Sequence, residues 1–131
     1  MEGGRSYVGL LVMVVVVAAM AMVMAMVEVE SYSDNCSGSG LCGTQVSKSD
    51  CTAAINRYDD GTVYSQYTSR VSGHCTAIFR CDGSYVSKTG AQLKQLFLHI
   101  YTNQPCGRCG SHAFDNCEAT LNYCGNCKDV N

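Results

Sequence analysis

Beyond residue 31 the chain is poor in the large aliphatic residues from which hydrophobic cores are built. All six methionines lie at or before Met26, and the later part contains only eight leucines and isoleucines. These are Leu41, Ile55, Ile78, Leu93, Leu96, Leu98, Ile100 and Leu121. A core of this size is marginal by itself. The domain therefore needs a further source of stability.

The same part of the chain has no excess of positive charge. From Tyr32 onward, four lysines and four arginines balance eight aspartates and glutamates. Proteins that bind nucleic acids normally carry a basic excess or a basic stripe. We therefore expect no nucleic-acid partner.

Catalytic motifs are also missing. None of the three histidines, His74, His99 and His112, is accompanied by a G-x-S-x-G or another nucleophile motif. His99 lies beside the apolar face of a helix pattern, whereas His112 falls in a segment that resembles an exposed loop. We expect a protein that is not an enzyme and has no cofactor, and a secreted hydrolase is the weakest alternative.

The first 31 residues have the layout of a secretory signal peptide. An almost unbroken apolar run from Val8 to Val27 follows Arg5 and precedes two glutamates. This pattern predicts cleavage at about residues 25–31. The alternative is an uncleaved anchor, because about 20 apolar residues can span a bilayer. Both alternatives export residues 32–131, and we expect a secreted, extracellular protein with no membrane association after signal removal.

Cysteines supply the missing stability. All ten lie in residues 32–131: Cys36, Cys42, Cys51, Cys75, Cys81, Cys106, Cys109, Cys117, Cys124 and Cys127. An even number at this density in an exported chain indicates a disulfide scaffold. Removing one native disulfide from a small secreted domain costs roughly 2 to 5 kcal/mol.

One cysteine spacing also suits a metal. Cys106-x2-Cys109 and Cys124-x2-Cys127 are separated by fourteen residues, close to the spacing of a four-cysteine zinc site. The export signal and the six further cysteines favour oxidation instead. We therefore expect disulfides and no metal.

Local patterns predict two helices and several strands. One helix is expected from about Asp50, interpreted as its N-cap, to Tyr58. A second follows the capping box of residues 89–92 and ends before Pro105. Extended segments are expected at 62–71, 75–81 and 118–123, after an irregular arm at 33–43. This order predicts an α+β fold, a small disulfide-rich two-layer α/β sandwich with an antiparallel sheet and two main helices.

Two cysteine motifs resemble those of the KP-four killer toxins, a family of virally encoded toxins of smut fungi. Residues 35–43 read N-C-S-G-S-G-L-C-G, and residues 106–111 read C-G-R-C-G-S after the second predicted helix. The chain then continues to Leu121-Asn122-Tyr123 in a terminal strand. The similarity covers roughly residues 35 to 131.

The resemblance implies five disulfides, with Cys36 paired with Cys106 and Cys42 with Cys109. It leaves the pairing of the other six cysteines open. It also implies a monomeric secreted toxin that inhibits other cells by blocking a cell-surface protein, a calcium channel in that family. Such blocking relies on a basic side chain, and Arg70, Arg80 and Lys88 are target-binding candidates by residue type.

A cell-wall or carbohydrate-binding module is the alternative function. Tyr64, Tyr67 and Tyr85 could provide rings on which sugars stack. Asn35-Cys36-Ser37 also matches an N-glycosylation acceptor, although its central cysteine is expected in a disulfide.

Overall fold

The computed structural model describes residues 32–83 and 86–131. Its elements are α2 (Cys42–Gln45), α3 (Lys48–Asn56), β1 (Val63–Ser65), β2 (Thr68–Ser72), β3 (Cys75–Cys81), β4 (Ser87–Thr89), α4 (Gly90–Thr102), β5 (Gly110–Phe114) and β6 (Cys117–Tyr123). The predicted signal peptide, residues 1–31, lies outside the described residues. Within those residues, no helix is long and apolar enough to cross a membrane.

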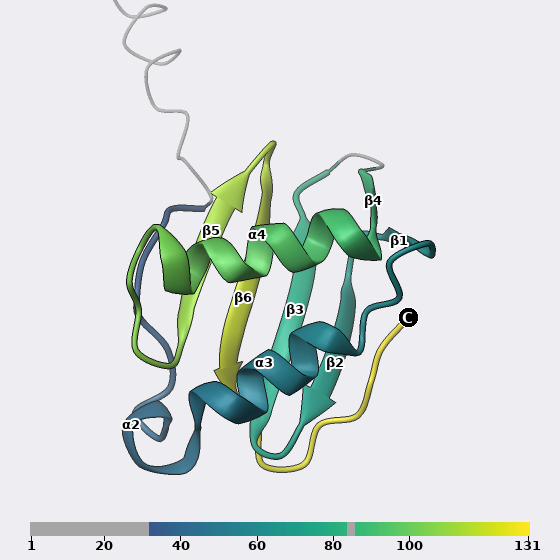
Figure 1. Cartoon of the computed structure of the whole chain (residues 1–131). Helices are drawn as coiled ribbons and strands as arrows, with labels where there is room; N and C mark the ends of the chain where they lie inside the picture. The colour runs from purple at the N-terminus through teal and green to yellow at the C-terminus, as the bar shows by residue number, and fades with distance from the viewer. Residues whose placement is uncertain (1–31, 84–85) are drawn as a thin grey trace, which may run out of the picture. The chain divides into compact units, whose positions relative to one another are not determined.

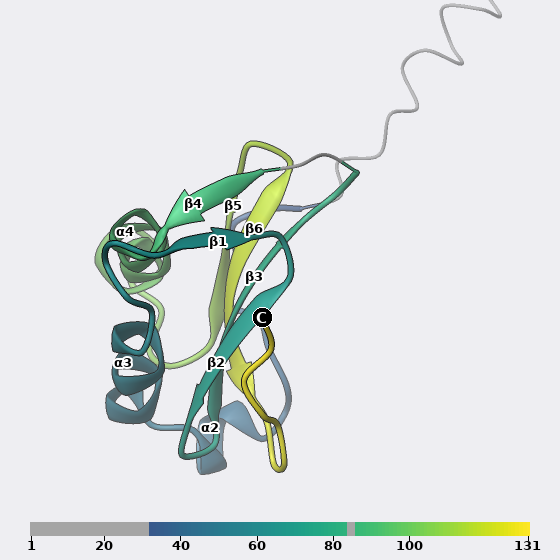
Figure 2. The ribbon, with the colours of Figure 1, turned by 90° about the vertical axis from the view of Figure 1, so that its right-hand side faces the viewer.

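The described domain has two layers. Four antiparallel strands form the main sheet in the order β2-β3-β6-β5, and α3 and α4 lie together across one of its faces (Figure 1). The view turned by 90° shows both helices on the same side of the sheet (Figure 2). β1 and β4 form a separate two-stranded ribbon that leads into α4. The predicted α+β sandwich is therefore confirmed.

The core lies between the helices and the two central strands. β3 and β6 pair so that buried residues stand opposite one another, as Phe79 and Ala119 do. α4 covers them with Leu93, Phe97 and Ile100, each of which is fully buried. Burying a side chain of this size stabilises the fold by roughly 1.5 to 3 kcal/mol.

A buried tyrosine joins α3 to the sheet. The hydroxyl of Tyr58 lies within hydrogen-bond distance of the carbonyl oxygens of Thr68 (3.2 Å) and Ala77 (2.9 Å). Its ring stacks on Phe97, with centroids 5.5 Å apart. Burial raises the pKa of Tyr58 to about 12. The hydroxyl therefore stays neutral and keeps a proton to donate.

The structure confirms one predicted helix start and corrects the other. At α4, Thr89 Oγ1 accepts from the Gln92 N–H and Gln92 Oε1 accepts from the Thr89 N–H, which completes the predicted capping box. The prediction of Asp50 as the first N-cap is wrong, because Ser47 Oγ accepts the Asp50 N–H and α3 begins at Lys48. Serine offers the same capping oxygen three residues earlier.

The extended segment predicted at 62–71 is two strands of different sheets. β1 ends at Ser65, β2 begins at Thr68, and Tyr67 between them has a φ of 61°. A left-handed residue cannot continue a strand. α2, β4 and β5 were not predicted. The composition of β5, Gly-Ser-His-Ala-Phe, has little apolar alternation, and its pairing with β6 holds it extended.

Five disulfides cross-link the described residues. They join Cys36 to Cys106, Cys42 to Cys109, Cys51 to Cys75, Cys81 to Cys117 and Cys124 to Cys127. The first two are the pairs that the killer-toxin resemblance implies, and the other three pair the six cysteines that it left open. All four cysteines of the zinc-like spacing are oxidised, so their sulfur atoms are not thiolates that could bind a metal.

Candidate functional site

The arm, residues 32–41, contains no helix or multi-residue strand and is held against the edge strand β5. Asn35 and Ser111 exchange two backbone hydrogen bonds with N···O distances of 3.0 and 2.9 Å. The disulfides Cys36–Cys106 and Cys42–Cys109 fasten the arm and α2 to the loop that follows α4. The two motifs that resemble the killer toxins therefore meet in space.

An open surface pocket lies where these motifs meet. Residues 36–39, Cys42 and Gly43 line it on the arm side, and residues 107–109 line it on the loop side. We call this set the bridged corner. Gly38 is required there, because a Cβ at this position would lie 2.8 Å from the Cβ of Cys109 and 2.9 Å from the Sγ of Cys42. The close approach of arm and loop thus depends on a missing side chain.

Arg108 provides the charge of the bridged corner. Its Nη1 donates to the carbonyl oxygens of Gly43 and, at 3.4 Å, Cys42, while its own carbonyl accepts the Tyr101 hydroxyl at 2.7 Å. Within residues 32–83 and 86–131, Arg108 forms no ion pair with an acid. A guanidinium cannot be deprotonated in a protein. The corner therefore presents a permanent, exposed positive charge.

A second cation lies near this corner. The Lys48 ammonium is 4.8 Å from the ring centroid of Tyr101, whose hydroxyl bonds the Arg108 carbonyl. Burial raises the pKa of Tyr101 to about 12, so this hydroxyl remains a donor. Lys48 and Arg108 thus contact the same residue, Tyr101.

The three predicted target-binding candidates lie elsewhere, and each is engaged within the molecule. Arg80 and Lys88 form ion pairs with acidic residues at 2.5 and 3.6 Å. Arg70 lies over the rings of Tyr58 and Tyr64, 5.3 and 5.2 Å from their centroids. Sequence reasoning did not single out Arg108. Its place between the cysteines of the second motif was the available signal.

The tyrosines considered for carbohydrate stacking differ in exposure. Tyr64 is only 6% exposed and its hydroxyl oxygen accepts the backbone N–H of Asp59 at 2.8 Å. Tyr67 is 55% exposed. Tyr85 lies outside the described residues. Of the two described rings, Tyr67 alone is open enough for a sugar to stack on.

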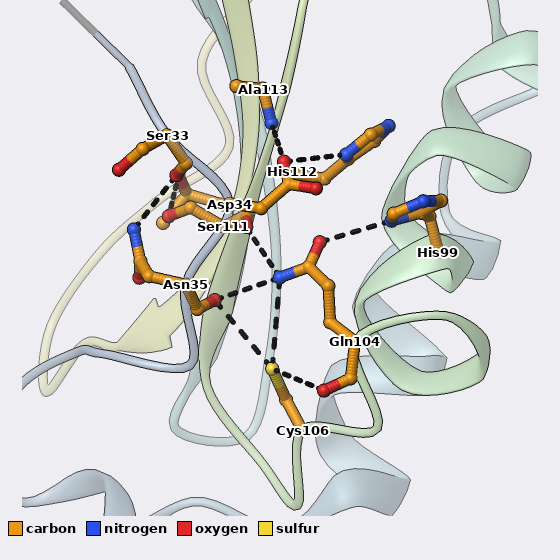
Figure 3. Close-up of polar contacts among 10 residues, drawn as sticks. Ser33, Asp34, Asn35, His99, Gln104, Cys106, Ser111, His112 and Ala113 are labelled. Atoms are coloured by element: carbon orange, nitrogen blue, oxygen red, sulfur yellow. Dashed lines mark hydrogen bonds and ion pairs between the residues drawn. The ribbon is translucent and has the colours of Figure 1, made fainter.

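Gln104 connects the arm, β5 and α4 (Figure 3). Its amide nitrogen donates to the carbonyl oxygens of Asn35 (3.0 Å) and Ser111 (2.8 Å), and its amide oxygen is 3.1 Å from His99 Nδ1. Because the nitrogen serves two carbonyls, the orientation of the amide is fixed. The remaining oxygen can only accept, so His99 carries a proton on Nδ1.

His112 was predicted on an exposed loop, but it lies on β5 with its side chain 15% exposed. Its ring stacks on His99 with centroids 3.7 Å apart, because alternate residues of β5 face α4. His112 Nδ1 is 3.0 Å from Asp34 Oδ1, which also accepts the Ala113 N–H at 2.7 Å (Figure 3). Burial by itself would raise the pKa of Asp34, but these two hydrogen bonds and the nearby histidines together lower it.

A model of a known protein family matches most of the described part of the chain. The family model MU117, described as a meiotically up-regulated gene family, matches residues 34–127. The matched segment contains all ten cysteines, the whole bridged corner and every labelled residue of Figure 3 except Ser33. No curated protein matches the chain. Because the model covers well over half of its length, the chain belongs to the MU117 meiotically up-regulated gene family.

Proposed function

We propose that this protein is a secreted, non-enzymatic inhibitor of the killer-toxin type, which binds a surface protein of another cell through the bridged corner. A calcium channel is the candidate target. One observation carries the proposal: both motifs that resemble the killer toxins line a single open pocket, and the charged residue in that pocket is Arg108.

The covalent structure supports export. Five disulfides within the described residues suit an oxidising environment, where such bonds persist. The predicted signal peptide provides the route. Secretion and toxin activity are both parts of this proposal.

The chemistry of Arg108 suits an acidic partner. An exposed guanidinium can bind a carboxylate through two parallel hydrogen bonds, which adds geometric specificity to charge attraction. Two disulfides fix the segments that carry it, so little conformational entropy is lost on binding. Since the exported part is near neutral overall, attraction to the target is local and not a long-range effect of net charge.

The test uses purified, oxidised protein and measures calcium uptake and growth of fungal cells. We expect R108Q to lose inhibitory potency by about tenfold or more, the range for a hydrogen bond to a charged group. K128Q, which removes the same charge from another exposed position, is the matched control and should retain potency. Inhibition that survives complete reduction and alkylation, or that is unchanged in R108Q, contradicts the proposal.

Exposure of Tyr67 favours one second candidate, a carbohydrate-binding module. The ring is 55% exposed, and Val63 in the neighbouring strand is 63% exposed. Sugar rings stack on exposed aromatic faces of this kind. Pull-down on chitin or glucan that is lost in Y67A would support this candidate. Retention of a Y67A variant as strong as that of the unchanged protein would exclude binding through this ring.

A further inference from the structure

Three side chains able to bind a metal converge beside the bridged corner. Asp34 comes from the arm, His99 from α4 and His112 from β5, and potential ligand atoms of the three lie within 4.8 Å of one another. The close-up shows them gathered between the arm and the helix (Figure 3). The proposed target-binding function does not use them.

Hydrogen bonding leaves one ring nitrogen of His99 free to bind a metal. Gln104 Oε1 holds the proton on Nδ1, which leaves a lone pair on Nε2 in the neutral ring. Histidines that bind metals usually donate their other ring N–H to an oxygen in this way, which fixes the tautomer and the ring orientation. The amide of Gln104 is itself oriented by the carbonyl oxygens of Asn35 and Ser111.

Asp34 and His112 are already spaced as ligands of one ion. The separation of 3.0 Å between Asp34 Oδ1 and His112 Nδ1 is close to the edge of a tetrahedron with bonds of about 2.0 Å, which is about 3.3 Å. A cation can therefore take the place of the proton shared by these atoms. Within the described residues, Asp34 Oδ2 makes no hydrogen bond, so this second carboxylate oxygen is available to bind a cation.

The covalent frame holds these groups together. The Cys36–Cys106 disulfide lies two residues from Asp34 on one side and two residues from Gln104 on the other. This bridge keeps the arm carboxylate near the helix even when no ion is bound. The ligands are thus partly preorganised, which lowers the entropy cost of binding.

We propose that Asp34, His99 and His112 bind one divalent transition-metal ion, such as Zn²⁺, which fastens the arm to α4 and β5. Two imidazoles and one carboxylate suit zinc and its neighbours better than Ca²⁺ or Mg²⁺, which prefer oxygen ligands. The rings of His99 and His112, now stacked 3.7 Å apart, must tilt to point at a common ion. Binding therefore changes the environment of both rings.

The test titrates the oxidised protein with Zn²⁺ alone, by calorimetry and by NMR of the histidine ring protons. We expect one ion per chain and shifts on His99 and His112. H99Q, H112Q and D34N should each weaken Zn²⁺ binding at least tenfold. H74Q is the matched control, because His74 is exposed and lies outside the cluster; it should bind as the unchanged protein does.

Absence of one-to-one binding at millimolar Zn²⁺ overturns the proposal, as does a loss in H74Q equal to that in H99Q. If H112Q does not fold, D34N and H99Q decide, because Asp34 lies on the exposed arm and His99 on α4, so neither substitution changes a strand of the sheet. The melting temperature gives an independent measurement. Zn²⁺ should raise it in the unchanged protein and in H74Q, and a rise of the same size in H99Q would contradict the site.

Discussion

The helix–sheet core and the arm are held in place by different forces. In the core, fully buried apolar side chains such as Leu93, Phe97 and Leu121 pack between α4 and the central strands. The arm buries little; it is held by two disulfides, a backbone bridge to β5 and the amide of Gln104.

Different interactions therefore stabilise the fold and position the candidate functional residues. Apolar burial is non-directional and scales with area, so it forms the sandwich without fixing single atoms. Disulfides and hydrogen bonds fix individual atoms, which is what a recognition surface requires. Both the bridged corner and the histidine cluster lie where the arm, held by directed bonds, meets the rest of the domain.

The largest effect is expected in the core. F97A should lower the free energy of unfolding by about 3 to 5 kcal/mol, because it removes a fully buried ring and leaves a cavity between α4 and Tyr58. Urea unfolding of the oxidised protein measures this. L41A, at an arm residue that is 43% exposed, is the control and should change stability by less than about 0.5 kcal/mol. Equal losses in the two variants would show that the arm carries as much apolar stabilisation as the core.

The next effect comes from the covalent frame. C36A/C106A opens a bridge between residues 70 positions apart, whereas C124A/C127A opens one between residues 3 apart. In the chain-entropy model the first costs about 4 kcal/mol and the second about 2 kcal/mol. Hydrogen exchange should show the first variant losing protection in the arm while α4 keeps its own. Loss of protection in α4 before the arm would contradict the division between the two regions.

The same difference between the core and the arm explains which features the sequence could predict. The helix now labelled α4 and the strand β3 were predicted because their capping box and apolar alternation are local patterns, set by residues a few positions apart. The disulfide density likewise needed only composition. The helix start at Lys48 was placed too late, since Ser47 and Asp50 are both good caps and only the structure shows which oxygen is used.

The arm and its site could not be predicted in this way. His112 and Asp34 stand 78 positions apart, and their contact depends on β5, a strand without a clear pattern of its own. The break at Tyr67 depends on a left-handed backbone that non-glycine residues rarely adopt. The sequence places Arg108 between the cysteines of the second motif, but its position in a pocket shared with the arm follows only from where the two disulfides bring the arm and loop together.

A smaller effect is expected at Gln104. Q104A leaves the carbonyl oxygens of Asn35 and Ser111 without the donor that the side chain supplies and should cost about 1 to 2 kcal/mol. Exchange of the backbone N–H groups that join Asn35 to Ser111 should become faster, while exchange in β3 should not change. Q45A, at an exposed glutamine of α2, is the control and should have little effect. Unchanged exchange at Asn35 in Q104A would show that the disulfides alone hold the arm.

The smallest effect is the acid sensitivity of the arm. The hydrogen bonds from Ala113 and His112 and the nearby histidines outweigh burial and lower the pKa of Asp34, so the folded value lies below the unfolded value of about 3.9. The contribution of the Asp34 carboxylate to the free energy of unfolding is then fully present above that pH and is lost as the pH falls through the folded pKa. D34N should be less stable than the unchanged protein by under about 1 kcal/mol above pH 4, because the carboxylate is partly exposed, and this difference should vanish on further acidification. Unfolding measured between pH 2 and 7 checks this, with S33A as the control whose difference should not vary with pH. A D34N difference that grows on acidification would show that the carboxylate does not stabilise the arm in its charged form.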